Sequence, residues 1–174
     1  MKKFLRVFLF MLLAAVVLSG CTVSVPRPAV TEGRFDFSVT YEVNGEEKTI
    51  SGVYVCKFVK ATASINGLYR EWDGYIEGSD IADENRYEIL ENEDGVIYLD
   101  LGLDPMYLMS DPFYSPGMSH AEVDGVPTAS FIIVYHDEIS QEMGGFSVDP
   151  ALLESYGVKI ISYEYDAPLD NIYE

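Results

Sequence analysis

Polar and apolar residues alternate without a break from Arg34 to Val43, which predicts a strand with one buried face. Asn44-Gly45 follows, the pair favoured in two-residue type I′ hairpin turns. Such a turn fixes the register of the next strand, so the apolar face is expected to continue over residues 50–58. The facing pairs predicted by this register are Val43–Glu46, Tyr41–Lys48, Val39–Ile50, Phe37–Gly52 and Phe35–Tyr54.

Several other segments have strand patterns at short intervals. Arg86–Glu91 and Val96–Leu101 flank a polar loop that ends in Gly95, which predicts a second hairpin. Thr128–His136 contains residues that are apolar on both sides and predicts a central strand of a sheet. Further strands are expected at Leu68–Ile76 and Val158–Tyr165.

Two short helices are predicted by Asp-Pro pairs, because Asp caps a helix N-terminus and Pro suits its first position. The pairs are Asp104-Pro105 and Asp149-Pro150, and Gly157 is placed to end the second helix. Seven or eight strands with frequent turns and one or two short helices predict an all-β fold. We expect a single antiparallel β-sandwich, loosely immunoglobulin-like, over residues 34–174.

The first 20 residues have the pattern of an export signal. Basic residues at positions 2, 3 and 6 precede an apolar run from Val7 to Leu18, which is too short for a membrane-spanning helix. Residues 1–20 are therefore predicted to be a signal peptide. Residues 21–33 are predicted to be a tether, because Pro-Arg-Pro within them favours extended backbone.

Leu18-Ser19-Gly20-Cys21 closes the apolar run and resembles the lipobox of bacterial lipoproteins. The resemblance implies cleavage before Cys21, a diacylglyceryl group on its sulfur and acylation of the new amine. Two or three acyl chains anchor a protein stably, so the lipid bilayer is the expected partner of this end of the chain. The expected location is the bacterial cell envelope, outside the cytoplasm. The alternative is an ordinary secretory signal with a chance cysteine.

The charge of the chain excludes some partners. Of 11 Lys and Arg residues three lie in the predicted signal, and all 29 Asp and Glu residues follow it, so the chain from Cys21 onward has a formal net charge of −21. Nucleic acid and anionic lipid both need a basic patch, and no nucleic-acid partner is expected.

Residues with catalytic potential are few, and the sequence contains none of the common hydrolase motifs. Cys56 falls on the apolar face of its strand and is expected to be a core residue. Trp72 is likewise predicted to be a core anchor. His136 is expected to lie in a polar turn at the end of a strand. We therefore expect no enzymatic activity, and a small carboxylate-dependent hydrolase is an alternative.

One acidic stretch suggests a calcium site, and calcium is the first candidate cofactor. Asp80, Asp83 and Glu84 are the candidate ligands, since calcium prefers oxygen donors, although the stretch is not an EF-hand and a solvated loop is the alternative. Copper is a lesser alternative, because thioether and imidazole ligands select Cu(I). The candidate copper ligands are Met106, Met109, Met118, His120 and Met143.

Tyrosine is abundant, with 13 residues. Tyr69, Tyr75, Tyr107 and Tyr114 lie beside Trp72 or among Pro and Gly, and they are the candidate residues for stacking on sugars or forming a protein interface. Ordinary packing is the alternative. The leading hypothesis is a non-enzymatic, membrane-anchored binding module for an envelope protein or glycan. A metal-binding lipoprotein is the second hypothesis.

Overall fold

The computed structural model describes residues 25–64, 67–78, 86–93, 95–115, 122–123, 125–136 and 150–174. Strands dominate these residues, and the all-β, sandwich-like fold predicted from the sequence is confirmed. The strands are β1 (Glu32–Val43), β2 (Glu46–Ser64), β3 (Gly67–Ile76), β4 (Arg86–Glu91), β5 (Gly95–Asp100), β6 (Glu122–Val123), β7 (Val126–Pro127), β8 (Ser130–Tyr135) and β9 (Val158–Tyr165). The helices are α2 (Pro105–Leu108) and α3 (Pro150–Ser155).

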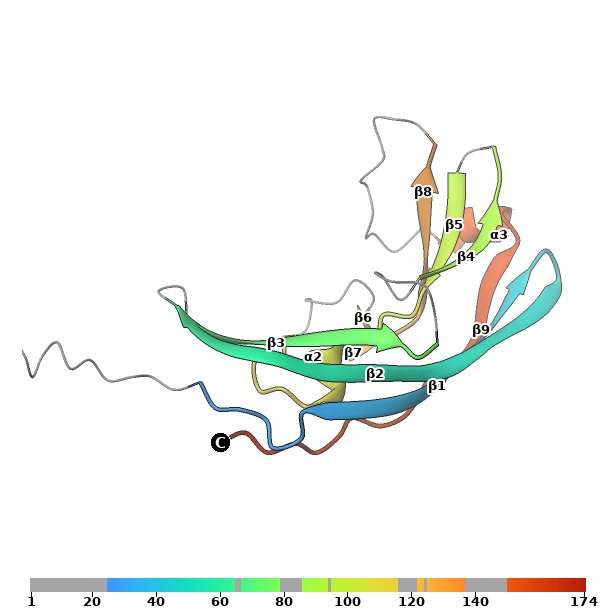
Figure 1. Cartoon of the computed structure of the whole chain (residues 1–174). Coiled ribbons are helices and arrows are strands. Elements are labelled where there is room, and N and C mark those ends of the chain that lie inside the picture. Colours follow the sequence, from blue (N-terminus) through green and yellow to red (C-terminus); the bar gives the residue numbers. More distant parts are fainter. Residues whose placement is uncertain are drawn as a thin grey trace, which may run out of the picture.

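Two antiparallel sheets form the body of the domain. The larger one has the strand order β3-β2-β1-β9, and the smaller one has the order β4-β5-β8. The large sheet is strongly curved, and the small sheet stands over the end of it where β9 begins (Figure 1). β6 and β7 pair with each other as a short ribbon.

The first hairpin matches the register predicted from its turn. All five facing pairs expected between β1 and β2 are observed, from Val43 opposite Glu46 to Phe35 opposite Tyr54. Asn44 and Gly45 both have positive φ angles, 52° and 82°, as a type I′ turn requires. The inward-facing residues of β1 are buried at every second position, so local alternation and turn chemistry determine this part of the fold.

The core lies between the inner face of the large sheet and the small sheet. Phe37, Val39 and Tyr54 of the large sheet are buried with Leu99 and Phe131 of the small sheet in one cluster. α2 adds Leu108, which is fully buried. A four-residue helix is too short to be stable alone, so this burial and the Asp104 cap, which accepts from the backbone N–H groups of the first turn, hold it in place.

Two sequence predictions need correction. β8 is the outermost strand of its sheet among the described residues, and β5 is the central one. The prediction of a central strand rested on Phe131, Ile132 and Ile133, which are buried and cover both faces of β8. Burial of the two faces does not reveal how many strands pair with β8 in the plane of the sheet. The predicted tether is also too long. β1 starts at Glu32, and Pro28 pairs with Tyr173 near the C-terminus.

Several candidate residues lie outside the described part of the chain. These are Cys21, Asp80, Asp83, Glu84, Met118, His120 and Met143. Within the described part, no helix is long and apolar enough to cross a membrane.

Candidate functional site

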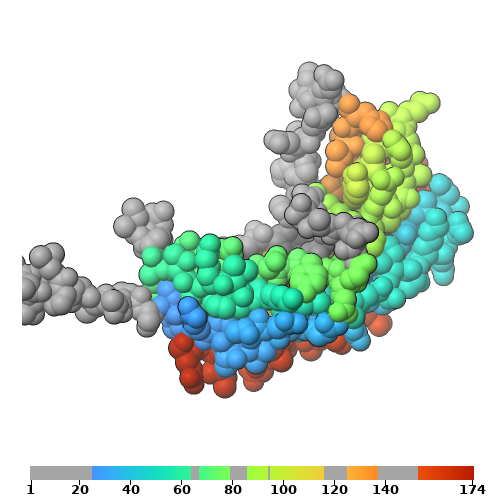
Figure 2. All heavy atoms as spheres, viewed as in Figure 1, coloured from blue at the N-terminus to red at the C-terminus, as the bar shows by residue number. Residues whose placement is uncertain are grey.

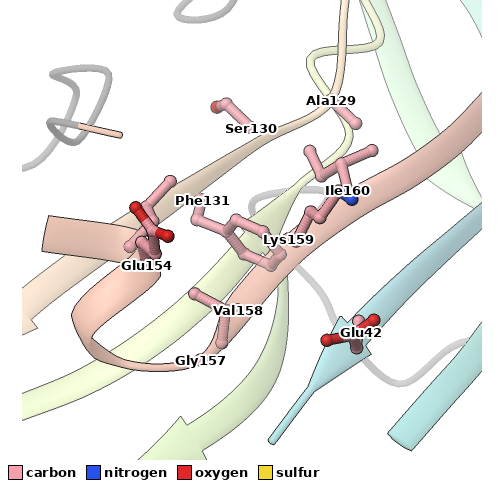
Figure 3. A pocket seen from close by; sticks show the side chains of 10 residues that line it. Glu42, Ala129, Ser130, Phe131, Glu154, Gly157, Val158, Lys159 and Ile160 are labelled. Carbon is pink, nitrogen blue, oxygen red and sulfur yellow. The ribbon is translucent and has the colours of Figure 1, made fainter. Parts of the chain in front are cut away.

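An open groove of about 700 Å³ lies where α3, β8 and β9 meet. Ser130 and Phe131 line it from β8, and Leu153 and Glu154 line it from α3 (Figure 3). β9 contributes residues 158–160. The volume is within the range of pockets that bind small molecules or single large side chains.

The groove follows β9, which is the outermost strand of its sheet among the described residues. Val158 and Ile160 pair with the inward-facing residues of β1, whereas Lys159 pairs with Glu42 on the outer face. Residues from both faces of β9 line the groove, which places it around the edge of the strand. β8, on the other side of the groove, is also the last strand of its sheet in the described residues. The outermost strand of a sheet presents a row of backbone N–H and C=O groups to a partner.

The floor of the groove is apolar and its rim is charged. Phe131, Val158 and Ala129 form the floor and are each buried. Glu154 and Lys159 are exposed at the rim. An apolar floor with a charged rim suits an apolar side chain whose neighbours are polar or charged.

Gly157 sets the start of the groove strand. It follows α3 with a φ of +65°, and its carbonyl accepts a hydrogen bond of 2.8 Å from the Asn44 backbone N–H. A Cβ at this position would lie 2.9 Å from Asn44 Oδ1. The predicted glycine at the end of the helix therefore also fixes β9 against the first hairpin turn.

A buried ion pair holds the opposite end of the domain together. Arg70 of β3 donates two hydrogen bonds of 2.8 Å to the two oxygens of Asp111, and the side chains are 1% and 0% exposed. Trp72 Nε1 and the Phe113 backbone N–H also donate to this carboxylate, each at 2.8 Å. In this arrangement, a bidentate pair with further hydrogen-bond donors, the interactions of the two charges compensate for the free energy that their burial costs.

The two ends of the described chain close over this pair. The Arg70 guanidinium lies between the rings of Phe113 and Tyr173, 4.0 and 4.4 Å from their centroids. It also donates a 2.9 Å hydrogen bond to the Pro26 carbonyl. Tyr173 Oη donates to the Met109 carbonyl at 2.7 Å. We call residues 25–30 and 171–174, which pair with each other here, the clasp.

The environment of the ion pair lowers the pKa of the Asp111 carboxyl. Burial opposes ionisation, but hydrogen bonds from Arg70, the Phe113 N–H and Trp72 and the charge of Arg70 outweigh it. Burial and the nearby Asp111 charge raise the pKa of Tyr173 to about 12. The carboxylate is therefore ionised and the phenol neutral over the physiological range of pH.

We expect the contribution of Asp111 to stability to disappear only in strong acid. A carboxyl whose pKa is lowered by folding stabilises the fold fully above its unfolded pKa of about 3.9, and the contribution is lost as pH falls through the lower folded pKa. Urea unfolding measured from about pH 6 to about pH 2 should thus show that wild type has a larger free energy of unfolding than Asp111→Asn, and that this difference becomes smaller below about pH 4. A difference in free energy of unfolding that stayed constant over this range of pH would contradict the expected role of the Asp111 carboxylate.

The candidate tyrosines separate into two pairs. Tyr107 and Tyr114 contact each other edge to face, with centroids 5.5 Å apart, and Tyr107 also meets Tyr165 at 6.5 Å. Both are half-buried, and burial raises the pKa of Tyr165 to about 12. Tyr107 and Tyr114 therefore each pack on a neighbouring aromatic ring of the domain.

The other two tyrosines lie on the outer face of β3. Tyr69 and Tyr75 are 45% and 36% exposed, and Lys57 Nζ lies 5.1 Å from the Tyr75 ring. They are six residues apart on one strand, about 20 Å, so they do not form one compact platform. Trp72 faces inward on the same strand and packs edge to face on Phe58.

The described residues that could react or bind a soft metal differ in their burial. Cys56 is fully buried, and burial followed by the charge of Asp104 raises the pKa of its thiol to about 12. His136 is exposed, with Nε2 3.1 Å from the Asn92 carbonyl oxygen. Met109 is buried and Met106 half-buried. Among the described residues, no three His, Cys, Asp or Glu side chains gather where they could hold a metal ion.

Sequence reasoning missed both the groove and the ion pair. Arg70 is in phase with Trp72 and Ile76, so its inward position could have been read from the alternation of β3. A buried arginine needs a carboxylate, but no local pattern selects Asp111 among the acids. No local sequence pattern marks groove residues such as Glu154 and Lys159, because the groove forms only where two sheets and a helix meet. No known protein family, curated protein or solved structure matches the chain.

Proposed function

We propose that the protein is a lipoprotein anchored through Cys21 outside the cytoplasm, and that its β-domain binds a partner protein of the envelope. The groove between β8, β9 and α3 carries this proposal. It joins an apolar floor to β9, the last strand of its sheet in the described part of the chain, and an extended peptide segment needs both an apolar pocket and a strand edge. Backbone hydrogen bonds would supply affinity, and an apolar side chain on the floor would supply specificity.

Charge favours a basic partner segment. The groove rim has two glutamates, Glu42 and Glu154, against one lysine, Lys159. The chain from Cys21 onward has a formal net charge of −21, so a basic segment would also be attracted over a longer range. We therefore expect an extended segment in which apolar residues alternate with polar ones, and which carries lysine or arginine next to its apolar anchor.

A peptide-display experiment tests this choice of ligand. Residues 22–174 are used to select from a random library of ten-residue peptides, and affinities of enriched peptides are measured by calorimetry. Enriched peptides should alternate apolar and polar residues and carry basic side chains. Glu154→Lys should weaken their binding about fivefold, because a rim charge contributes about 1 kcal/mol.

A matched variant separates the groove from general charge. Asp73→Lys makes the same change of charge on β3, at the other edge of the large sheet, and should leave affinity unchanged at moderate salt. Equal losses in the two variants would contradict binding in the groove. Turnover of a substrate by the purified protein, lost on mutation of one acid or histidine, would support the hydrolase alternative instead.

Two other ligand classes, a glycan and calcium, would each give a different experimental result. A glycan that stacked on Tyr69 or Tyr75 of the outer face of β3 would protect these exposed tyrosines from chemical modification. Calcium binding by Asp80, Asp83 and Glu84 would raise the midpoint of thermal unfolding in millimolar calcium relative to EDTA.

A further inference from the structure

The clasp places the start of the described chain and its C-terminus at one end of the domain. Arg27 and Glu174 exchange two backbone hydrogen bonds, and the Ala29 N–H donates to the Ile172 carbonyl at 2.7 Å. The Asn171 side chain bonds both the N–H and the carbonyl of Val30. Arg70 of β3 donates a hydrogen bond to the Pro26 carbonyl and so connects the clasp to β3. The position of residues 26–30 is therefore fixed by the fold.

Large apolar side chains are exposed around the same end. Ile172 is 63% exposed, and it lies between two residues of the clasp that point inward. Leu68 and Tyr69 directly precede Arg70, and Val30 pairs with Asn171. Figure 2 shows the β2–β3 hairpin end, the first described residues and the C-terminal residues together at one end of the molecule. We call Val30, Leu68, Tyr69 and Ile172 the anchor-end residues.

Very little chain separates this end from the predicted lipid. Cys21 precedes Pro26 by five residues, and five residues span at most about 18 Å. The headgroup region of one leaflet is about 6 Å deep. A domain attached in this way cannot move its anchor end far from the bilayer surface.

We propose that the anchor-end residues rest in the headgroup region of the membrane and so orient the domain. This inference relies on the proposed acylation of Cys21. Tyrosine favours the membrane interface, and leucine, isoleucine and valine lose exposed apolar area there. The acidic domain adds no attraction to anionic lipid, so the contact is apolar and occurs on zwitterionic lipid.

The same orientation turns the groove away from the membrane. β1 runs from Glu32 at the anchor end to Val43 beside the groove, a distance of about 36 Å along the strand. Figure 1 shows α3 and the small sheet at the end of the large sheet opposite to the C-terminus. A partner segment would therefore bind in the groove well outside the headgroup region.

The test uses residues 21–174 coupled through Cys21 to a maleimide phospholipid in phosphatidylcholine vesicles. Cys56 is fully buried, so coupling is directed to Cys21. One variant carries Tyr69→Trp at the anchor end, and a matched variant carries Tyr135→Trp on β8, where the tyrosine is 37% exposed. Spin-labelled lipid is then added to quench tryptophan fluorescence, and the wild type corrects for Trp72.

Quenching of the added fluorescence in Tyr69→Trp should exceed that in Tyr135→Trp by about twofold or more. Leu68→Asp with Ile172→Asp should remove the difference, while the urea midpoint confirms that this exposed pair leaves the fold intact. Equal quenching at both positions, or stronger quenching in Tyr135→Trp, would overturn the proposal. Because coupling is chemical and no peptide is present, this result is independent of whether cells acylate Cys21 and of what the groove binds.

Discussion

Replacing Asp111 with alanine should lower the free energy of unfolding by about 3–5 kcal/mol, because the Arg70 guanidinium would stay buried without a counter-charge. The substitution also removes the acceptor of the Trp72 Nε1 and Phe113 N–H groups. Buried donors without a partner are costly in themselves. Urea unfolding of residues 22–174 at neutral pH measures the change.

A nearby acid on the surface provides the control. Glu71 lies next to Arg70 on β3 and pairs with Lys60 at 2.9 Å, but both side chains are about half exposed. Glu71→Ala should therefore leave the unfolding midpoint unchanged, since water and salt screen such pairs. If Asp111→Ala were as mild as Glu71→Ala, the ion pair would contribute nothing to the fold.

Much of the larger sheet could be predicted from local sequence. Unbroken alternation from Phe35 to Val43 and the Asn44-Gly45 turn together determine which residues face each other, and both signals lie within a few residues. The pairing of β1 with β9 could not be read in this way, because it joins segments more than a hundred residues apart. Which apolar faces meet depends on the whole core, and so does the position of β8 at the end of its sheet among the strands that the structure describes.

The candidate sites were harder to predict, for a physical reason. Tyr69 lies in a predicted strand and Tyr107 in a predicted helix, but neither pattern tells whether the ring is exposed. Only tertiary contacts distinguish exposed Tyr69 from half-buried Tyr107. The groove is made by Phe131, Leu153 and Val158, which in the sequence are ordinary core residues. Sequence patterns indicate which residues are apolar, but not where the packing of two sheets leaves an opening between them.

Deleting residues 171–174 should lower the free energy of unfolding by about 3 kcal/mol or more. The deletion removes the Tyr173 ring from the desolvated Arg70 guanidinium, a contact that contributes about 2 kcal/mol in such places. It also removes the hydrogen bonds of Asn171 to Val30, each worth about 1 kcal/mol. The freed residues regain conformational entropy, which offsets part of the loss. Urea unfolding measures the change.

Ile172→Ala is the matched control, because its side chain is 63% exposed and contributes little to the clasp. It should unfold at the wild-type urea concentration, and a truncated chain that did the same would show that the clasp is dispensable. On lipid-coupled vesicles the truncation has a second consequence. The hydrogen bond from Arg70 to the Pro26 carbonyl is then the first remaining contact with the large sheet, without the support of the C-terminal strand. When this bond opens, the next contact is at the Thr31 carbonyl, which accepts from the Phe58 N–H ten residues after Cys21, so the connecting segment can reach about 35 Å. The anchor end can then move farther from the headgroup region, and the quenching difference between Tyr69→Trp and Tyr135→Trp should shrink.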